Sequence, residues 1–107
     1  MPAGSYDLVH PLWGSHGCTD CHVPNSRLNL SGGSASCGIV RDGTDIAGGQ
    51  YLNNPLCSNA SSILSVPAGG VRPDNTLHPG GKDGCFASNS MCSQTILAWC
   101  RAGAACP

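Results

Sequence analysis

The chain has 107 residues, of which 15 are glycine and 8 are proline, and only 5% are aromatic. This length fits a single domain over residues 1–107, with a thin apolar core that needs staples or a buried prosthetic group. Charged residues make up 10% of the chain and the net charge is −1, so we expect no nucleic-acid partner and no polybasic membrane anchor. No apolar run approaches the about 20 residues that span a bilayer, so we also expect no membrane span.

The first elements in chain order are short and are separated by irregular sequence. Residues 6–13 predict a short helix that ends near Pro11, because proline disrupts a helix interior. Residues 23–57 are rich in glycine, serine and asparagine and are expected to be mostly irregular. Residues 61–65 predict one or two helical turns, and residues 68–90 predict a long loop whose length suggests a function.

The strongest helical pattern covers residues 91–102. Ser90 is a suitable N-cap and Gly103 a suitable C-terminal stop. Apolar residues recur on one face at helical spacing; they are Cys92, Ile96, Leu97 and Cys100. The sequence therefore predicts a mainly α fold of a few short helices with much irregular loop.

Eight cysteines in 107 residues indicate an oxidising compartment. We therefore expect a periplasmic or extracellular protein. Met1 is not followed by a basic stretch and an apolar run. We interpret the chain as a mature or excised form.

Cys18-Thr19-Asp20-Cys21-His22 matches C-x-x-C-H, the signature of covalent attachment of a c-type haem. Two thiols three positions apart can form thioethers with the two vinyl groups of one porphyrin, and the adjacent imidazole can then bind the iron. The motif predicts one haem c on Cys18 and Cys21, with His22 as the proximal ligand. Zinc is the chemical rival, since C-x-x-C is half of a zinc site, and a plain disulfide is another. No second C-x-x-C and no H-x-x-x-H follow.

Further segments occur in an order that is itself informative. An apolar-Pro-apolar-aromatic segment precedes C-x-x-C-H; Arg-Leu-x-Leu, Ser-Ser-apolar-Leu, His-Pro-Gly-Gly, Phe-Ala-Ser, Ile-Leu-Ala-Trp and Gly-Ala follow it. They lie at residues 9–13, 27–30, 61–64, 78–81, 86–88, 96–99 and 103–104. The set from His10 to Gly103 resembles the monohaem cytochrome c domains often called planctomycete-type. Among the extra cysteines that depart from the family, Cys100 stands where it usually has an aliphatic residue.

The resemblance implies a cytochrome c-like domain wrapped around the haem, with His78 as the distal ligand. Pro79 and the glycines after it could hold that loop close to the porphyrin. Met91 is the alternative ligand, and packing at the helix start is its structural alternative. We expect His16 to be too near the attachment site to reach the opposite haem face, and His10 to make structural contacts. Two axial histidines imply a low potential and no vacant iron site.

The six cysteines outside the motif allow about 15 pairings. A helix over residues 92–100 separates Cys92 from Cys100 by about 12 Å, beyond the about 7 Å that a disulfide permits between Cα atoms. The preferred set joins neighbours in the sequence, and pairing between subunits stays as an alternative. This set is Cys37–Cys57, Cys85–Cys92 and Cys100–Cys106.

Electron transfer between redox partner proteins is the leading functional hypothesis, and we do not expect an enzyme. A second hypothesis is a cytochrome subunit of a larger assembly, either an enzyme complex or an electron-conducting polymer built by self-association. A small peroxidase is the third, and it requires an open iron site.

Overall fold

The computed structural model describes residues 4–24, 26–44, 49–52, 57–59, 61–69 and 83–107. Within these ranges the chain forms α- and 3-10 helices, and its β structure is limited to an isolated bridge between Thr44 and Gln50. The α-helices are α1 (Tyr6–Ser15), α2 (Cys37–Asp42), α3 (Ser62–Ser65) and α4 (Met91–Arg101). The 3-10 helices are η1 (Cys18–Asp20), η2 (Gly33–Ser36) and η3 (Gly84–Phe86). The protein is therefore a small, mainly α protein, as the sequence predicts.

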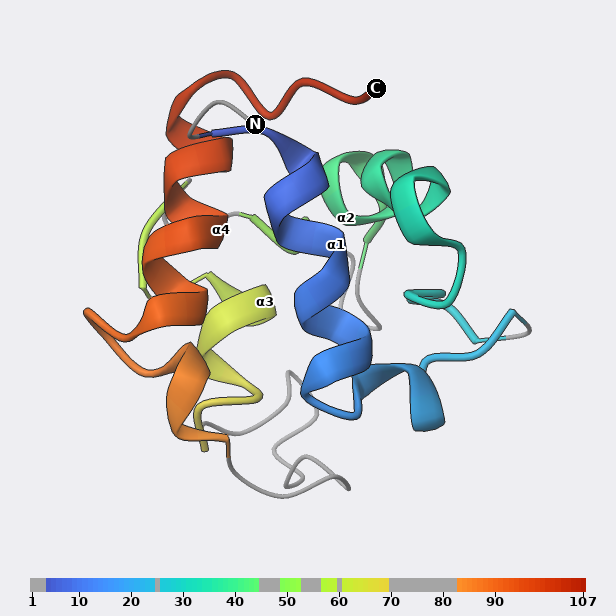
Figure 1. The fold of residues 1–107 in the computed structure, drawn as a ribbon, viewed down its shortest axis with the longest axis horizontal. Helices are drawn as coiled ribbons and strands as arrows, with labels where there is room; N and C mark the ends of the chain where they lie inside the picture. Colours follow the sequence, from blue (N-terminus) through green and yellow to red (C-terminus); the bar gives the residue numbers. More distant parts are fainter. Residues whose placement is uncertain (1–3, 25, 45–48, 53–56, 60, 70–82) are drawn as a thin grey trace.

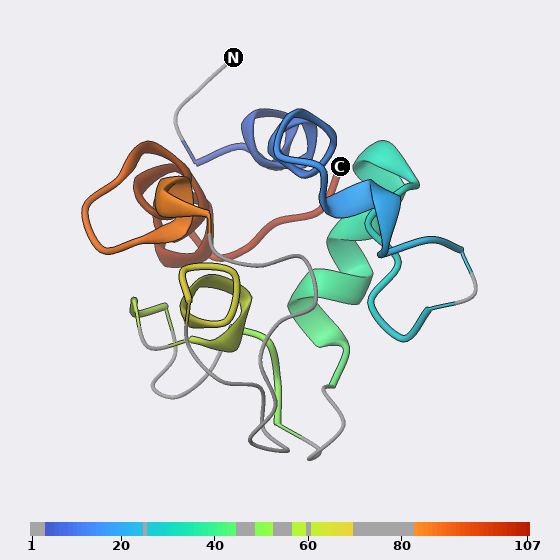
Figure 2. The ribbon, with the colours of Figure 1, turned by 90° about the horizontal axis from the view of Figure 1, so that it is seen from below.

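Helix α1 holds the other elements together. It contacts α4 on one side and η2 on the other, and η1 follows it along the chain. Figure 1 shows α1 and α4 beside each other. In Figure 2, α3 lies next to α4, and α2 lies next to η2. The buried apolar side chains of these elements form one cluster. Of the helices described, none has the length and apolar content to cross a membrane.

The predicted end of the first helix near Pro11 is wrong, because α1 continues to Ser15 with Pro11 inside it. Pro11 cannot donate to the carbonyl of Asp7 one turn earlier. Tyr6, Val9 and Trp13 on the same helix are at most 1% exposed. Burial of this apolar face outweighs the loss at an exposed proline, since tertiary packing supplies most of the stability of a short helix.

Helix α4 begins directly after Ser90, as the sequence predicts, and ends at Arg101, one residue before the predicted end. The amide of Ala104 donates to the carbonyl of Trp99, and the amide of Gly103 donates to that of Cys100. This pair of bonds is a Schellman motif, which needs a left-handed residue at Gly103; its φ is 110°. The predicted inward face is confirmed, because all its members are buried.

Residues 23–57 are less irregular than expected, because η2 and α2 lie within them. A glycine-rich stretch with a helix of six residues has too weak a pattern to be recognised. Cys37 and Val40 nevertheless bury this segment in the core. The one or two turns predicted over residues 61–65 correspond to α3, which has four residues.

A buried chain of hydrogen bonds joins α1 to η2. Trp13 Nε1 donates to the Tyr6 hydroxyl at 3.0 Å, and Ser36 Oγ donates to the carbonyl of Gly33 at 2.7 Å. The Tyr6 hydroxyl lies 2.6 Å from Ser36 Oγ. Because Ser36 uses its one proton on Gly33, the Tyr6 hydroxyl must donate in this bond. Burial raises the pKa of Tyr6 above its usual value, so the hydroxyl keeps the proton that this bond needs.

The cysteine pairs are Cys37–Cys106, Cys57–Cys100 and Cys85–Cys92, with Cα–Cα distances of 5.6, 5.6 and 5.0 Å. The predicted Cys85–Cys92 bond and the exclusion of Cys92–Cys100 are confirmed. The predicted Cys37–Cys57 and Cys100–Cys106 bonds are wrong. Cys100 points into the core from α4, and the tail after Gly103 turns back, with Trp99 Nε1 bonded to the carbonyl of Ala105. This turn carries Cys106 to α2.

We predict that Tyr6→Phe lowers the free energy of unfolding by about 1–3 kcal/mol, because it leaves the buried Trp13 donor without its acceptor. Urea denaturation followed by circular dichroism measures the change. Ser34→Ala, at an exposed position of η2, is the control and should change stability by less than about 0.5 kcal/mol. Equal stability of Tyr6→Phe and the parent chain would contradict the structural role of this bond.

Candidate functional site

The C-x-x-C-H segment folds into a tight turn directly after α1. Gly17 has φ 74°, a left-handed conformation that lets the chain leave α1 and enter η1. The amides of Cys21 and His22 both donate to the carbonyl of Cys18, at 3.3 and 2.9 Å. These bonds bring the two cysteines and the histidine of the motif together through local structure alone.

Cys18 and Cys21 are the two thiols left when the other six cysteines have formed disulfides. Cys18 is half-buried and packs against the core, whereas Cys21 is exposed. The unpaired thiols are therefore those that the sequence assigns to haem attachment, at the end of α1 and beside the apolar core.

The imidazole of His22 is held by the loop that follows it. Its Nδ1 lies 3.0 Å from the carbonyl oxygen of Leu28. A carbonyl only accepts, so Nδ1 carries the proton and the lone pair of the neutral ring lies on Nε2. Histidine ligands of metals usually have such a backbone partner on the other nitrogen, which fixes the tautomer and the ring orientation. The amide of Leu30 donates to the carbonyl of His22 at 3.1 Å and closes the loop.

The Cys18 thiol lies in an environment that disfavours its anion. Burial, followed by the negative charge of Asp83, raises the pKa of this thiol to about 11. Cys18 is thus kept as a neutral thiol at physiological pH. Asp83 comes from a distant part of the chain, where it caps η3 by accepting from the amide of Cys85 at 2.8 Å.

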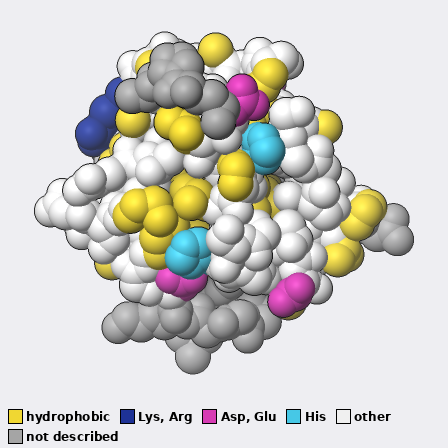
Figure 3. All heavy atoms as spheres, in the orientation of Figure 1, with side chains coloured by type: hydrophobic (Ala, Val, Ile, Leu, Met, Phe, Trp, Pro, Cys, Tyr) yellow, Lys and Arg dark blue, Asp and Glu magenta, His cyan; other side chains and the backbone are white. Residues whose placement is uncertain are grey.

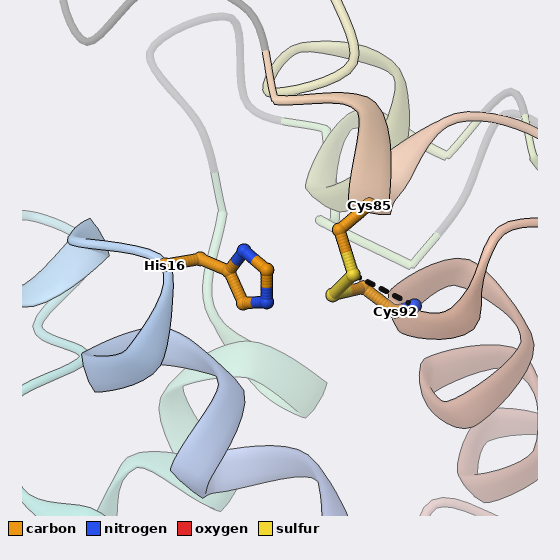
Figure 4. Close-up of side chains that lie close together, drawn as sticks. All are labelled: His16, Cys85 and Cys92. Atoms are coloured by element: carbon orange, nitrogen blue, oxygen red, sulfur yellow. Dashed lines mark hydrogen bonds between the residues drawn. A yellow bond between two sulfur atoms is a disulfide. The ribbon is translucent and has the colours of Figure 1, made fainter.

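His16, at the end of α1, also meets Asp83. Its Nδ1 lies 2.9 Å from Asp83 Oδ2. One ring nitrogen of His16 and the sulfur atoms of Cys85 and Cys92 all lie within 4.8 Å of one another (Figure 4). Both sulfurs belong to one disulfide, so the group offers no thiolate to a metal.

The remaining histidines and Met91 divide between the described and undescribed parts of the chain. His78, the predicted distal ligand, lies outside the described residues. Met91 is 56% exposed at the start of α4, so its expected packing role is wrong. His10 makes structural contacts, as expected. Its Nε2 lies 3.8 Å from Asp7 Oδ1, and its ring centroid lies 6.0 Å from that of Tyr6.

The surface around these elements carries little charge. Figure 3 shows apolar side chains and histidines near the middle of one face, with few charged side chains on it. Leu8, Val23 and Met91 are the large apolar residues exposed in the described part of the chain. Such a surface gives little long-range steering of a charged partner.

Two contributors to the site are not among the residues that the sequence predicts. The Leu28 carbonyl has no signal in the sequence, because a backbone partner is defined only once the loop is folded. Asp83 does have a signal, since aspartate two positions before Cys85 fits a cap of the short helix there. Its proximity to His16 and Cys18 could not be predicted from the nearby sequence, because these residues are far apart in the chain.

Comparisons of the chain with protein-family models, with curated proteins and with solved structures found no match. The functional assignment accordingly depends on the residues and geometry of the chain itself.

We predict that iodoacetamide alkylates Cys18, in the chain with both motif thiols unmodified, at a rate that rises with pH. The rate should keep rising until the pH reaches the thiol pKa of about 11. Asp83→Asn removes the negative charge that opposes the thiolate, so the pKa should fall and alkylation at a given pH should become faster. Peptide mass spectrometry measures the rate at Cys18. Asp20→Asn, at an exposed carboxylate in η1, is the control; an equal effect of both changes would contradict the role of Asp83.

Proposed function

We propose that this chain binds one c-type haem through thioethers at Cys18 and Cys21, with His22 as an iron ligand, and that it transfers electrons. The observation that carries the proposal is the state of the cysteines. Six of eight are paired, and the two left as thiols stand at the spacing of C-x-x-C-H.

The chain's own residues fit this group in three ways. The Cys18 and Cys21 thiols can form the two thioethers, and Nε2 of His22 has the lone pair that an iron ligand needs. The Leu28 carbonyl orients the ring and increases its basicity through the hydrogen bond at Nδ1. When bound, a haem iron supplies one-electron oxidation and reduction.

The apolar side chains near Cys18 favour a buried prosthetic group. Cys18 packs against the core, and the rings of Trp13 and Phe86 stack with 2° between their planes and 6.0 Å between their centroids. A haem attached at Cys18 would lie beside this core and be shielded from water on that side. This burial would also supply apolar mass that a chain with few aromatic residues lacks.

The zinc alternative is less well supported. Among the described residues, the cluster with ligand atoms close enough for a metal is His16 with Cys85 and Cys92, and a disulfide occupies its sulfurs. The motif thiols of Cys18 and Cys21 do not belong to it. A structural zinc site needs four ligands, and the motif supplies three.

His78 is proposed as the second axial ligand, on the strength of the resemblance to planctomycete-type domains. Two histidines would leave no iron site for a substrate, which favours a relay over an enzyme such as a peroxidase. The three disulfides are typical of an oxidising compartment, and we propose that the protein acts in the periplasm or outside the cell.

A subunit role is the second candidate, since the face in Figure 3 has little charge and Leu8, Val23 and Met91 are exposed. Depletion of charged residues is typical of the core of a protein interface. Sedimentation of the native protein tests the idea. A strictly monomeric particle at high concentration would contradict it.

We predict that protein from cells that attach c-type haem shows sharp α and β absorption bands on reduction. Replacing Cys18 and Cys21 by serine should abolish covalently held colour, because no thioether can form. Thr19→Ala combined with Asp20→Asn changes only the residues between the cysteines and should leave the spectrum intact. A colourless parent chain, correctly matured, would overturn the proposal.

We predict that His78→Ala shifts the haem spectrum toward high spin and lets cyanide bind, because the iron loses its second ligand. Met91→Ala should leave the spectrum unchanged, since Met91 lies at the surface. His78→Met should restore a low-spin iron at a higher potential, because a thioether raises the potential relative to an imidazole. A high-spin spectrum from Met91→Ala, and not from His78→Ala, would reverse the ligand assignment.

A further inference from the structure

The Cys85–Cys92 disulfide differs from the other two in the length of chain it closes. Its cysteines are 7 positions apart, whereas the other pairs are 69 and 43 positions apart. A disulfide restricts the unfolded chain more when it closes a longer loop. Opening the short loop therefore costs the fold less than opening Cys37–Cys106 or Cys57–Cys100, which hold distant segments together.

An imidazole paired with a carboxylate lies beside this bond. Figure 4 shows the His16 ring turned toward the disulfide, within the 4.8 Å given above. Asp83 holds the Nδ1 edge of the ring, and Phe86 meets it edge-on with 5.9 Å between ring centroids. A protonated imidazole donates at both nitrogens, so the Nε2 proton is left for a neighbouring sulfur.

The two sulfurs also lie at the start of α4. Cys92 is the second residue of the helix, and its amide donates to Cys85 Sγ at 3.1 Å. The amino end of a helix stabilises a thiolate. Both thiolates that form when the bond opens would thus be stabilised, that of Cys92 by its place in the first turn and that of Cys85 by the amide.

We propose that Cys85–Cys92 is a thiol–disulfide exchange site for a dithiol reductant, with His16 as proton donor and Asp83 as the residue that positions it. A thiolate of the dithiol bonds to Cys85 Sγ, the sulfur of the more exposed cysteine, and the Cys85–Cys92 bond breaks. The Cys92 thiolate takes a proton from His16. The second thiol of the reductant then attacks its own sulfur in the mixed disulfide and releases Cys85. The dithiol is oxidised to a disulfide, and its two protons end on Cys85 and Cys92, one of them through His16.

Proton donation by His16 makes this exchange depend on pH. Among the described residues, the groups that face its ring are Asp83 at the start of η3, Phe86 and the disulfide. The negative charge of Asp83 also acts on the Cys18 thiol. The rate per thiolate of reductant should fall as the imidazole loses its proton.

Reduction of the native protein by dithiothreitol, stopped by alkylation and analysed by peptide mass spectrometry, tests the proposal. Cys85 and Cys92 should be modified first, with the other four cysteines still paired. His16→Gln should slow their reduction by about tenfold or more, and His10→Gln, on the same helix, should not. After correction for the dithiothreitol thiolate concentration, the rate constant of the native chain should fall with rising pH, and that of His16→Gln should stay flat.

Three outcomes would overturn the exchange site. One is that all three disulfides open together, and another is that His16→Gln is reduced as fast as the native chain. The third is a corrected rate of the native chain that does not depend on pH, a measurement that needs no variant to fold. None of these readouts involves haem, so failure here is distinct from failure of the proposed function.

Discussion

The hydroxyl of Tyr6 is the constraint on which the arrangement of α1 depends. It accepts from Trp13 on its own helix and donates to Ser36 at the end of η2, all within the buried core. The Tyr6 ring also packs against Trp99 of α4, with 4.8 Å between ring centroids. One side chain thereby fixes α1 against both of its neighbours. In a protein with so few aromatic residues, directional bonds of this kind position elements that apolar bulk alone would leave loose.

Helix α1 determines the position of the candidate site. Because the helix continues through Pro11 to Ser15, His16 and the left-handed Gly17 follow at its end, and the motif turn begins there. The same helix end meets Asp83, the N-cap of η3. The Cys85–Cys92 bond links η3 to α4. The motif thiol of Cys18, a carboxylate and a disulfide from distant parts of the sequence therefore share one region. The His22 ring is oriented separately, by the loop that returns to it at Leu28.

Features with local causes could be predicted from the sequence. Residues close together in the sequence predict the start of α4 and the inward face of that helix. They also predict the Cys85–Cys92 bond. The two long-range pairings could not be predicted, because loop-closure entropy changes slowly with loop length and does not rank one distant partner over another. Cys37 meets Cys106 only because the tail folds back at Gly103. The motif residues Cys18, Cys21 and His22 were evident from the sequence, whereas the Leu28 carbonyl and the Asp83 charge exist only in the folded chain.

The central claim is covalent attachment of one haem at Cys18 and Cys21, and the intact mass of the protein tests it most directly. Protein from cells that attach c-type haem would be unfolded without reductant and weighed by mass spectrometry. We predict the mass of the chain with three disulfides plus one haem, retained after unfolding, with no thiol open to alkylation. The mass of the chain alone, with two thiols that react with an alkylating reagent, would contradict the account.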